Sequence, residues 1–82
     1  MTEITLCARR LGQPDVHEYF GRKFPLPEYY GNNLDALFDV LTSLSETTVK
    51  VRGTAKNEQA EQVLQVLRDA AEENENLTLI EK

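Results

Sequence analysis

The sequence has few of the residues that form disulfides, metal sites and membrane spans. Its 82 residues include one cysteine, one histidine and no tryptophan. The single cysteine, Cys7, excludes an intramolecular disulfide, and it lacks the neighbouring cysteines and histidines of a zinc site. We expect Cys7 to be a small buried hydrophobe. No apolar run approaches the roughly 20 residues that cross a bilayer.

The beginning of the chain lacks the pattern of a secretory signal. Glu3 stands where a signal peptide has basic residues, and no long apolar stretch follows it, so we expect a cytoplasmic protein. The length predicts a single domain over residues 1–82. The net charge of −5 disfavours nucleic acids and anionic membranes as partners and favours basic proteins, although solubility alone would also explain it.

The pattern of apolar residues predicts an α/β domain. Short segments rich in β-branched residues alternate with amphipathic stretches of helical period. Strands that are separated by helical crossovers pair in parallel, and the crossovers are expected to be right-handed. The order β-α-α-β-α-β therefore predicts a two-layer domain with a three-stranded parallel sheet. The strands are expected at 4–7, 47–51 and 77–80, and the helices at 15–24, after the N-cap Asn33, and at 58–74.

The stretch 26–39 is the most informative part of the sequence. It combines a proline near its start, two adjacent tyrosines, a glycine, a helix N-cap and two carboxylates four residues apart. At about 100° per residue, one broad face of its helix is apolar: Leu34, Leu37, Val40, Leu41 and Leu44. The opposite side carries a different set: Asp35, Phe38, Asp39 and Thr42.

Each residue of that second set also has a structural explanation. Carboxylates at positions i and i+4 repel each other by a few tenths of a kcal/mol. The helix dipole nevertheless favours Asp35 near the N-terminus, and Asp39 is explained as a solvated acid. Phe38 is explained as packing at the edge of the core, and we expect one of Tyr29 and Tyr30 to pack against the core. The combination of aromatics with paired carboxylates is more typical of a protein-binding hot spot.

The sequence offers little support for catalysis. His17 is the single histidine, no serine or cysteine has a recognisable base, and no glycine-rich phosphate loop is present. Asp35 and Asp39 lie on an exposed helix face where no cleft is implied. Two carboxylates without histidine or cysteine partners bind metal poorly. We therefore expect a protein that is not an enzyme and that uses no metal or cofactor.

The stretch 26–39 strongly resembles the barstar family of intracellular inhibitors of the bacterial ribonuclease barnase. A second and weaker match covers 63–70, in a helix where the family carries a contributing acid. Asp69 stands at that position, although alone it would be explained as an exposed acid beside Glu72 and Glu73. The resemblance implies the barstar fold and a ribonuclease inhibitor, or immunity protein, that binds one to one and blocks the cationic active site.

The family assigns roles to individual positions. By resemblance, the Asp39 carboxylate replaces an RNA phosphate and accepts charge-assisted hydrogen bonds, with Asp35 in support. Tyr29 is expected to stack on an active-site residue of the enzyme, and Gly31 allows close approach of the backbone. The full set of implied partner-binding residues is Tyr29, Gly31, Asn33, Leu34, Asp35, Phe38, Asp39, Thr42 and Asp69.

The chain also departs from the family pattern. Phe38 and Leu44 replace tryptophans, Ser43 replaces a glycine, and Asp69 replaces a glutamate. The segment 51–60 is shorter than in the family and lacks its extra short helix. These changes favour a partner other than barnase. An alternative is an interaction module of the same fold that binds another basic protein, while a small enzyme is the least favoured class.

Overall fold

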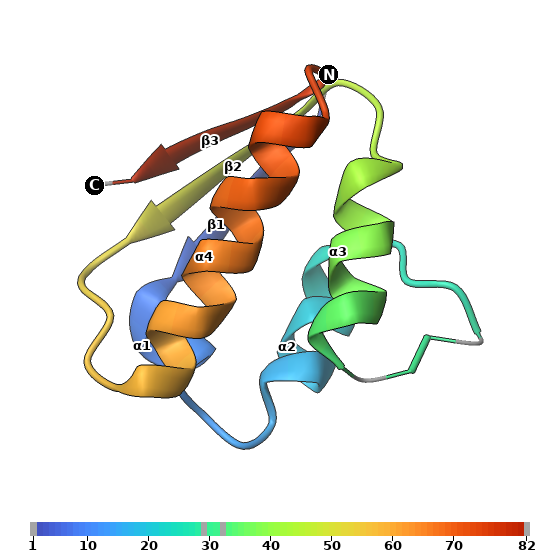
Figure 1. The fold of residues 1–82 in the computed structure, drawn as a ribbon. Coiled ribbons are helices and arrows are strands. Elements are labelled where there is room, and N and C mark those ends of the chain that lie inside the picture. The colour runs from blue at the N-terminus through green and yellow to red at the C-terminus, as the bar shows by residue number, and fades with distance from the viewer. Residues whose placement is uncertain (1, 29, 32, 82) are drawn as a thin grey trace.

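The predicted α/β architecture is confirmed. The structure is a computed structural model that describes residues 2–28, 30, 31 and 33–81. Figure 1 shows the elements in chain order. They are β1 (Thr2–Cys7), α1 (Ala8–Leu11), α2 (Val16–Lys23), α3 (Leu34–Thr42), β2 (Thr47–Arg52), α4 (Glu58–Glu73) and β3 (Leu77–Glu81). The single-turn helix α1, which follows β1 directly, was not predicted from the sequence.

The three strands form one parallel sheet, as the sequence predicted, and β2 lies in its centre. The order is β1-β2-β3, and Val49 pairs with Ile4 on one side and with Leu79 on the other. Buried and more exposed residues alternate along β1 and β2. This alternation shows that one face of the sheet lies against the core while the other is open. On the open face, Lys50 forms a 3.2 Å ion pair with Glu3.

The helices cover the buried face of the sheet and complete the second layer. Helix α4 packs against α1, α3 and β3, so it lies at the centre of the helical layer (Figure 1). Large apolar side chains from both layers fill the space between them. The largest fully buried side chains are Phe20, Leu6, Leu11, Leu37, Leu41, Leu67, Val49, Val51 and Val63.

Helix α3 is fixed at both ends by asparagine side chains. At its N-terminus Asn33 has an extended backbone (φ −138°), and its Oδ1 accepts a 2.8 Å hydrogen bond from Ala36 N–H. The predicted N-cap is therefore confirmed. At its C-terminus, the buried Asn74 donates from Nδ2 to the carbonyls of Leu41 (3.0 Å) and Leu44 (2.8 Å). The first bond adds to the one that Leu41 O accepts from Leu44 N–H (3.3 Å), and the second attaches the residue that lies just beyond α3.

Cys7 differs from its expected position in the core. Its side chain is only half-buried, because it follows the alternation of Glu3 and Thr5 rather than that of Ile4 and Leu6. The Cys7 backbone N–H donates a 2.9 Å hydrogen bond to the hydroxyl of Tyr19. Within the described ranges, no helix combines the length and the apolar character needed to cross a membrane.

Candidate partner-binding site

The two carboxylates of α3 lie exposed, one helical turn apart. We call Asp35, Asp39 and Thr42 the acidic face of α3. Asp35 and Asp39 are exposed, and Thr42 is half-buried. Ion pairs in the described part of the chain join Arg10 to Asp15, Lys50 to Glu3 and Arg68 to Glu81. Neither carboxylate of the acidic face belongs to one of these pairs, so both are available to an external cation.

The hydroxyl groups at the end of α3 are directed toward its own backbone. Thr42 Oγ1 donates to the carbonyls of Phe38 (3.0 Å) and Asp39 (3.1 Å), and Ser43 Oγ donates to Asp39 O (2.9 Å). Such bonds are common for serine and threonine within helices. The two hydroxyl protons are thereby used inside the helix. The remaining hydrogen-bonding capacity of these side chains is that of acceptors, which adds to the acceptor character of the acidic face.

The burial of the apolar residues of α3 agrees only in part with the sequence prediction. Leu37 and Leu41 are fully buried, as expected. Leu34 and Phe38 are half-buried and pack against the core, so Phe38 adopts the edge-of-core position that was its structural alternative. Val40 does not join the buried core. It is half-buried and lines a surface cavity, because the segment that crosses this side of α3 leaves it partly open.

The segment before α3 brings further predicted residues to the same end of the helix. Gly31 is exposed, and its carbonyl accepts a 3.3 Å hydrogen bond from Asn33 Nδ2. A Cβ atom built on Gly31 would lie 3.0 Å from that Nδ2 atom, so the site is tight for any larger residue. Tyr30 is half-buried against the core, which confirms that one of the two tyrosines packs there. Tyr29 lies outside the described residues.

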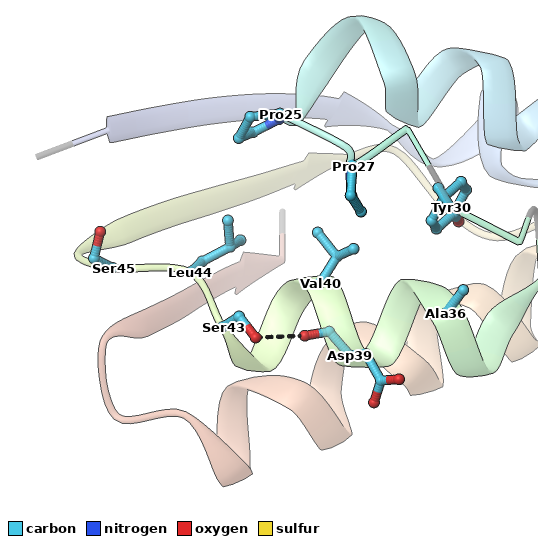
Figure 2. Close-up of a pocket in the computed structure, with 9 residues that line it drawn as sticks. All are labelled: Pro25, Pro27, Tyr30, Ala36, Asp39, Val40, Ser43, Leu44 and Ser45. Atoms are coloured by element: carbon cyan, nitrogen blue, oxygen red, sulfur yellow. Dashed lines mark hydrogen bonds between the residues drawn. The ribbon is translucent and has the colours of Figure 1, made fainter.

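A cavity of about 590 Å³ separates α3 from the segment that precedes it. Figure 2 shows that the Asp39 carboxylate points away from the two prolines, while the Val40 side chain points toward them. Of the acidic face, only Asp39 borders the cavity, and its carboxylate is directed away from the two prolines. No pattern in the sequence indicated this cavity, which is lined by Pro25, Pro27, Tyr30, Ala36, Asp39, Val40, Ser43, Leu44 and Ser45.

Asp69 belongs to a different element from the other predicted residues. It is exposed on α4, and its Oδ1 accepts a 2.9 Å hydrogen bond from Gln65 Nε2. Helices α3 and α4 pack against each other (Figure 1). The structure thus gathers Gly31, Asn33 and the acidic face around α3, with Asp69 on the neighbouring helix.

Sequence reasoning missed a polar contact behind this surface. His17 Nδ1 lies 2.7 Å from the hydroxyl of Tyr30, so α2 is linked to the segment before α3. Burial lowers the pKa of His17 and raises the pKa of Tyr30. Both shifts favour the neutral forms, between which the hydrogen bond runs in the direction that the imidazole tautomer sets. The pairing of two polar residues 13 positions apart gives no local signal in the sequence.

Side chains that ligate metals do not cluster in the described part of the chain. Among residues 2–28, 30, 31 and 33–81, no three histidine, cysteine, aspartate or glutamate side chains converge as metal ligands. The chemistry available at α3 is therefore that of exposed carboxylates, backbone carbonyls and an adjacent aromatic edge. The carboxylates and carbonyls accept hydrogen bonds from cations such as guanidinium and ammonium groups.

Comparison with known proteins identifies relatives. The profile of the family described as Barstar (barnase inhibitor) matches residues 5–80, which is nearly the whole chain. A Bacillus subtilis (strain 168) protein named "Putative ribonuclease inhibitor YrdF" is 35 % identical over an alignment of 81 residues. That alignment covers 89 % of this chain and 89 % of the relative, so the two proteins correspond over most of their lengths.

Proposed function

Because this chain belongs to the barstar family, we propose that it inhibits a bacterial ribonuclease by covering the enzyme's cationic active site. The match to a family of barnase inhibitors and to a relative named as a ribonuclease inhibitor supports a ribonuclease-inhibitor-like role. In our proposal the protein acts in the cytoplasm as an immunity protein, forms a one-to-one complex, and has no catalytic activity of its own.

The observation that carries this proposal is the acidic face of α3. A ribonuclease active site must bind the phosphates of RNA, so it presents cationic side chains. Asp39 is our central anchor, and its carboxylate takes the place of a phosphate, with Asp35 one turn away in support. Asp69 contributes from α4. Charge-assisted hydrogen bonds of this kind are shorter and stronger than neutral ones.

The residues around the acidic face complete the proposed contact surface. Leu34 and Phe38 provide apolar contact beside the carboxylates, and Gly31 and Asn33 allow the enzyme to approach the N-terminal end of α3. Tyr29 is included by its match to the family. The net charge of −5 also attracts a basic partner over a distance, an effect that falls as ionic strength rises.

The test is a titration of ribonuclease activity with the protein and its variants. Barnase and the basic ribonucleases of the host organism are assayed by cleavage of a fluorescent RNA substrate. Asp39→Asn and Asp35→Asn remove one charge each and preserve shape. Glu3→Gln is the matched control, because it removes the same charge on the open face of the sheet, away from the helices.

We expect Asp39→Asn to weaken inhibition about 10- to 100-fold, the range for losing a hydrogen bond to a charged group. Asp35→Asn should have a smaller effect, and Glu3→Gln should inhibit nearly as well as the wild type. If both aspartate variants inhibit as well as Glu3→Gln, the proposed site is wrong. Tight binding to a basic protein that is not a ribonuclease would instead favour an interaction module of the same fold.

A further inference from the structure

His17 and Tyr30 form a link between helix α2 and the segment that leads into α3. The His17 Nδ1 atom and the Tyr30 hydroxyl are 2.7 Å apart. Their rings also pack together, with centroids 5.6 Å apart and planes inclined by 55°. The two residues are therefore joined by a hydrogen bond and by a ring contact, and together these interactions restrict the positions of both side chains.

Tyr30 attaches the segment before α3 to helix α2. Among the described residues of this segment, the other hydrogen bonds are local. Leu26 N–H donates to Phe24 O (2.9 Å), Tyr30 N–H donates to Pro27 O (3.0 Å), and Asn33 Nδ2 donates to Gly31 O (3.3 Å). These bonds shape the segment internally. The bond to His17 joins it to a different helix.

The position of Tyr30 in the chain connects this link to the partner-binding surface. Tyr30 directly precedes Gly31, and the N-cap Asn33 follows three residues after Tyr30. Tyr30 also forms part of the wall of the cavity beside α3 (Figure 2). A displacement of the Tyr30 ring would therefore move Gly31 and the entrance to α3 together, while the core of the helix stays in place.

We propose that His17 is a positioning residue for inhibition, which acts through Tyr30 to hold the segment before α3 in its binding conformation. This inference rests on the proposed function. His17 is half-buried on α2 and is absent from the set of implied contact residues, so its contribution comes from preorganisation. A segment that is already ordered loses less conformational entropy when the partner binds.

The test compares variants that remove and restore the link, assayed on the ribonuclease that the wild type inhibits. Tyr30→Phe removes the hydroxyl, and His17→Leu removes the ring nitrogen. His17→Asn places an amide near the position of Nδ1. The control is Gln59→Ala, since Gln59 Nε2 joins α4 to Leu11 O (3.0 Å) and Gln13 O (2.7 Å), away from α3. Thermal unfolding of each variant is measured in parallel.

We expect Tyr30→Phe and His17→Leu each to weaken inhibition about three- to tenfold, the range for one lost hydrogen bond. The double variant should be no weaker than the single ones, because both remove the same bond. His17→Asn should recover most of the loss. Gln59→Ala should lower the unfolding temperature while inhibition stays within about twofold of the wild type, as expected for a distant and independent site.

Two results would overturn the inference. In the first, Tyr30→Phe and His17→Leu lower the unfolding temperature about as much as Gln59→Ala does, and they weaken inhibition no more than Gln59→Ala does. In the second, the effects of the two changes simply add. If Asp39→Asn weakens inhibition in the same assay while these variants do not, the positioning role fails and the proposed function stands. If Asp39→Asn has no effect either, both fail.

Discussion

Replacement of Asn74 by alanine should destabilise the protein strongly, because this side chain joins three parts of the fold. Its Nδ2 donates to the carbonyls of Leu41 (3.0 Å) and Leu44 (2.8 Å), and its Oδ1 accepts from Asn76 N–H (3.0 Å). Asn74 is 8 % exposed. The alanine variant therefore removes all three bonds, and the Leu41 carbonyl keeps only the hydrogen bond that it accepts from the backbone around Leu44.

The magnitude follows from the number of bonds lost. Each hydrogen bond contributes about 1 kcal/mol net, and buried groups left without partners cost about 1–3 kcal/mol each. We expect Asn74→Ala to lower the free energy of unfolding by about 2–4 kcal/mol. A domain of this size has a total of roughly 4–12 kcal/mol. The variant should therefore unfold at a markedly lower urea concentration and temperature.

Equilibrium unfolding in urea, followed by circular dichroism, measures this change. Asn76→Ala is the control, since Asn76 is an exposed neighbour of Asn74 whose backbone would remain in place. We expect the control to change stability by no more than about 0.5 kcal/mol. An Asn74→Ala variant within the same limit would refute the reasoning, because the three bonds would then contribute no net stability.

Two other substitutions test the support of α3. Asn33→Ala removes the N-cap bond to Ala36 N–H and should cost about 1 kcal/mol in urea unfolding, whereas an unchanged midpoint would mean that solvent caps the helix equally well. Burial lowers the pKa of His17 below its ordinary value of 6.5, so the unfolded chain binds the proton more readily than the folded one. The resulting stability is present above pH 6.5 and is lost as the pH falls from there through the folded-state pKa. The free energy of unfolding of the wild type should therefore fall more steeply below pH 6.5 than that of His17→Leu. If the two proteins lose stability in parallel as the pH falls, the lowered pKa of His17 does not contribute to stability.

Features that arise within one element were predictable from the sequence. The β-branched residues of β2 and the apolar period of α4 identified both elements to within one or two residues. Asn33 was predicted as an N-cap because its side chain satisfies a backbone group only three residues away. The acidic face of α3 was also predictable, because residues four positions apart, such as Asp35 and Asp39, lie on the same face of a helix however that helix packs.

Features that depend on contact between elements were not predictable in the same way. Helical spacing assigned Val40 to the core, but spacing alone does not show how far a neighbouring segment covers a helix. The bonds from Asn74 to Leu41 and from His17 to Tyr30 join residues 33 and 13 positions apart. Cys7 was expected inside because free cysteines are commonly buried, yet the alternation along β1 places it with the outer residues.

This division separates the residues that we propose contact a partner from those that support them. Asp35 and Asp39 are exposed, and a charge change there alters the surface while the packed core remains intact. Asn74 and Tyr30 instead determine where that surface lies, since they attach the C-terminal end of α3 and the segment before its N-terminus. Variants of the first kind should change affinity at constant stability. Loss of Asn74 should change both together, and Tyr30→Phe should fall between these two classes.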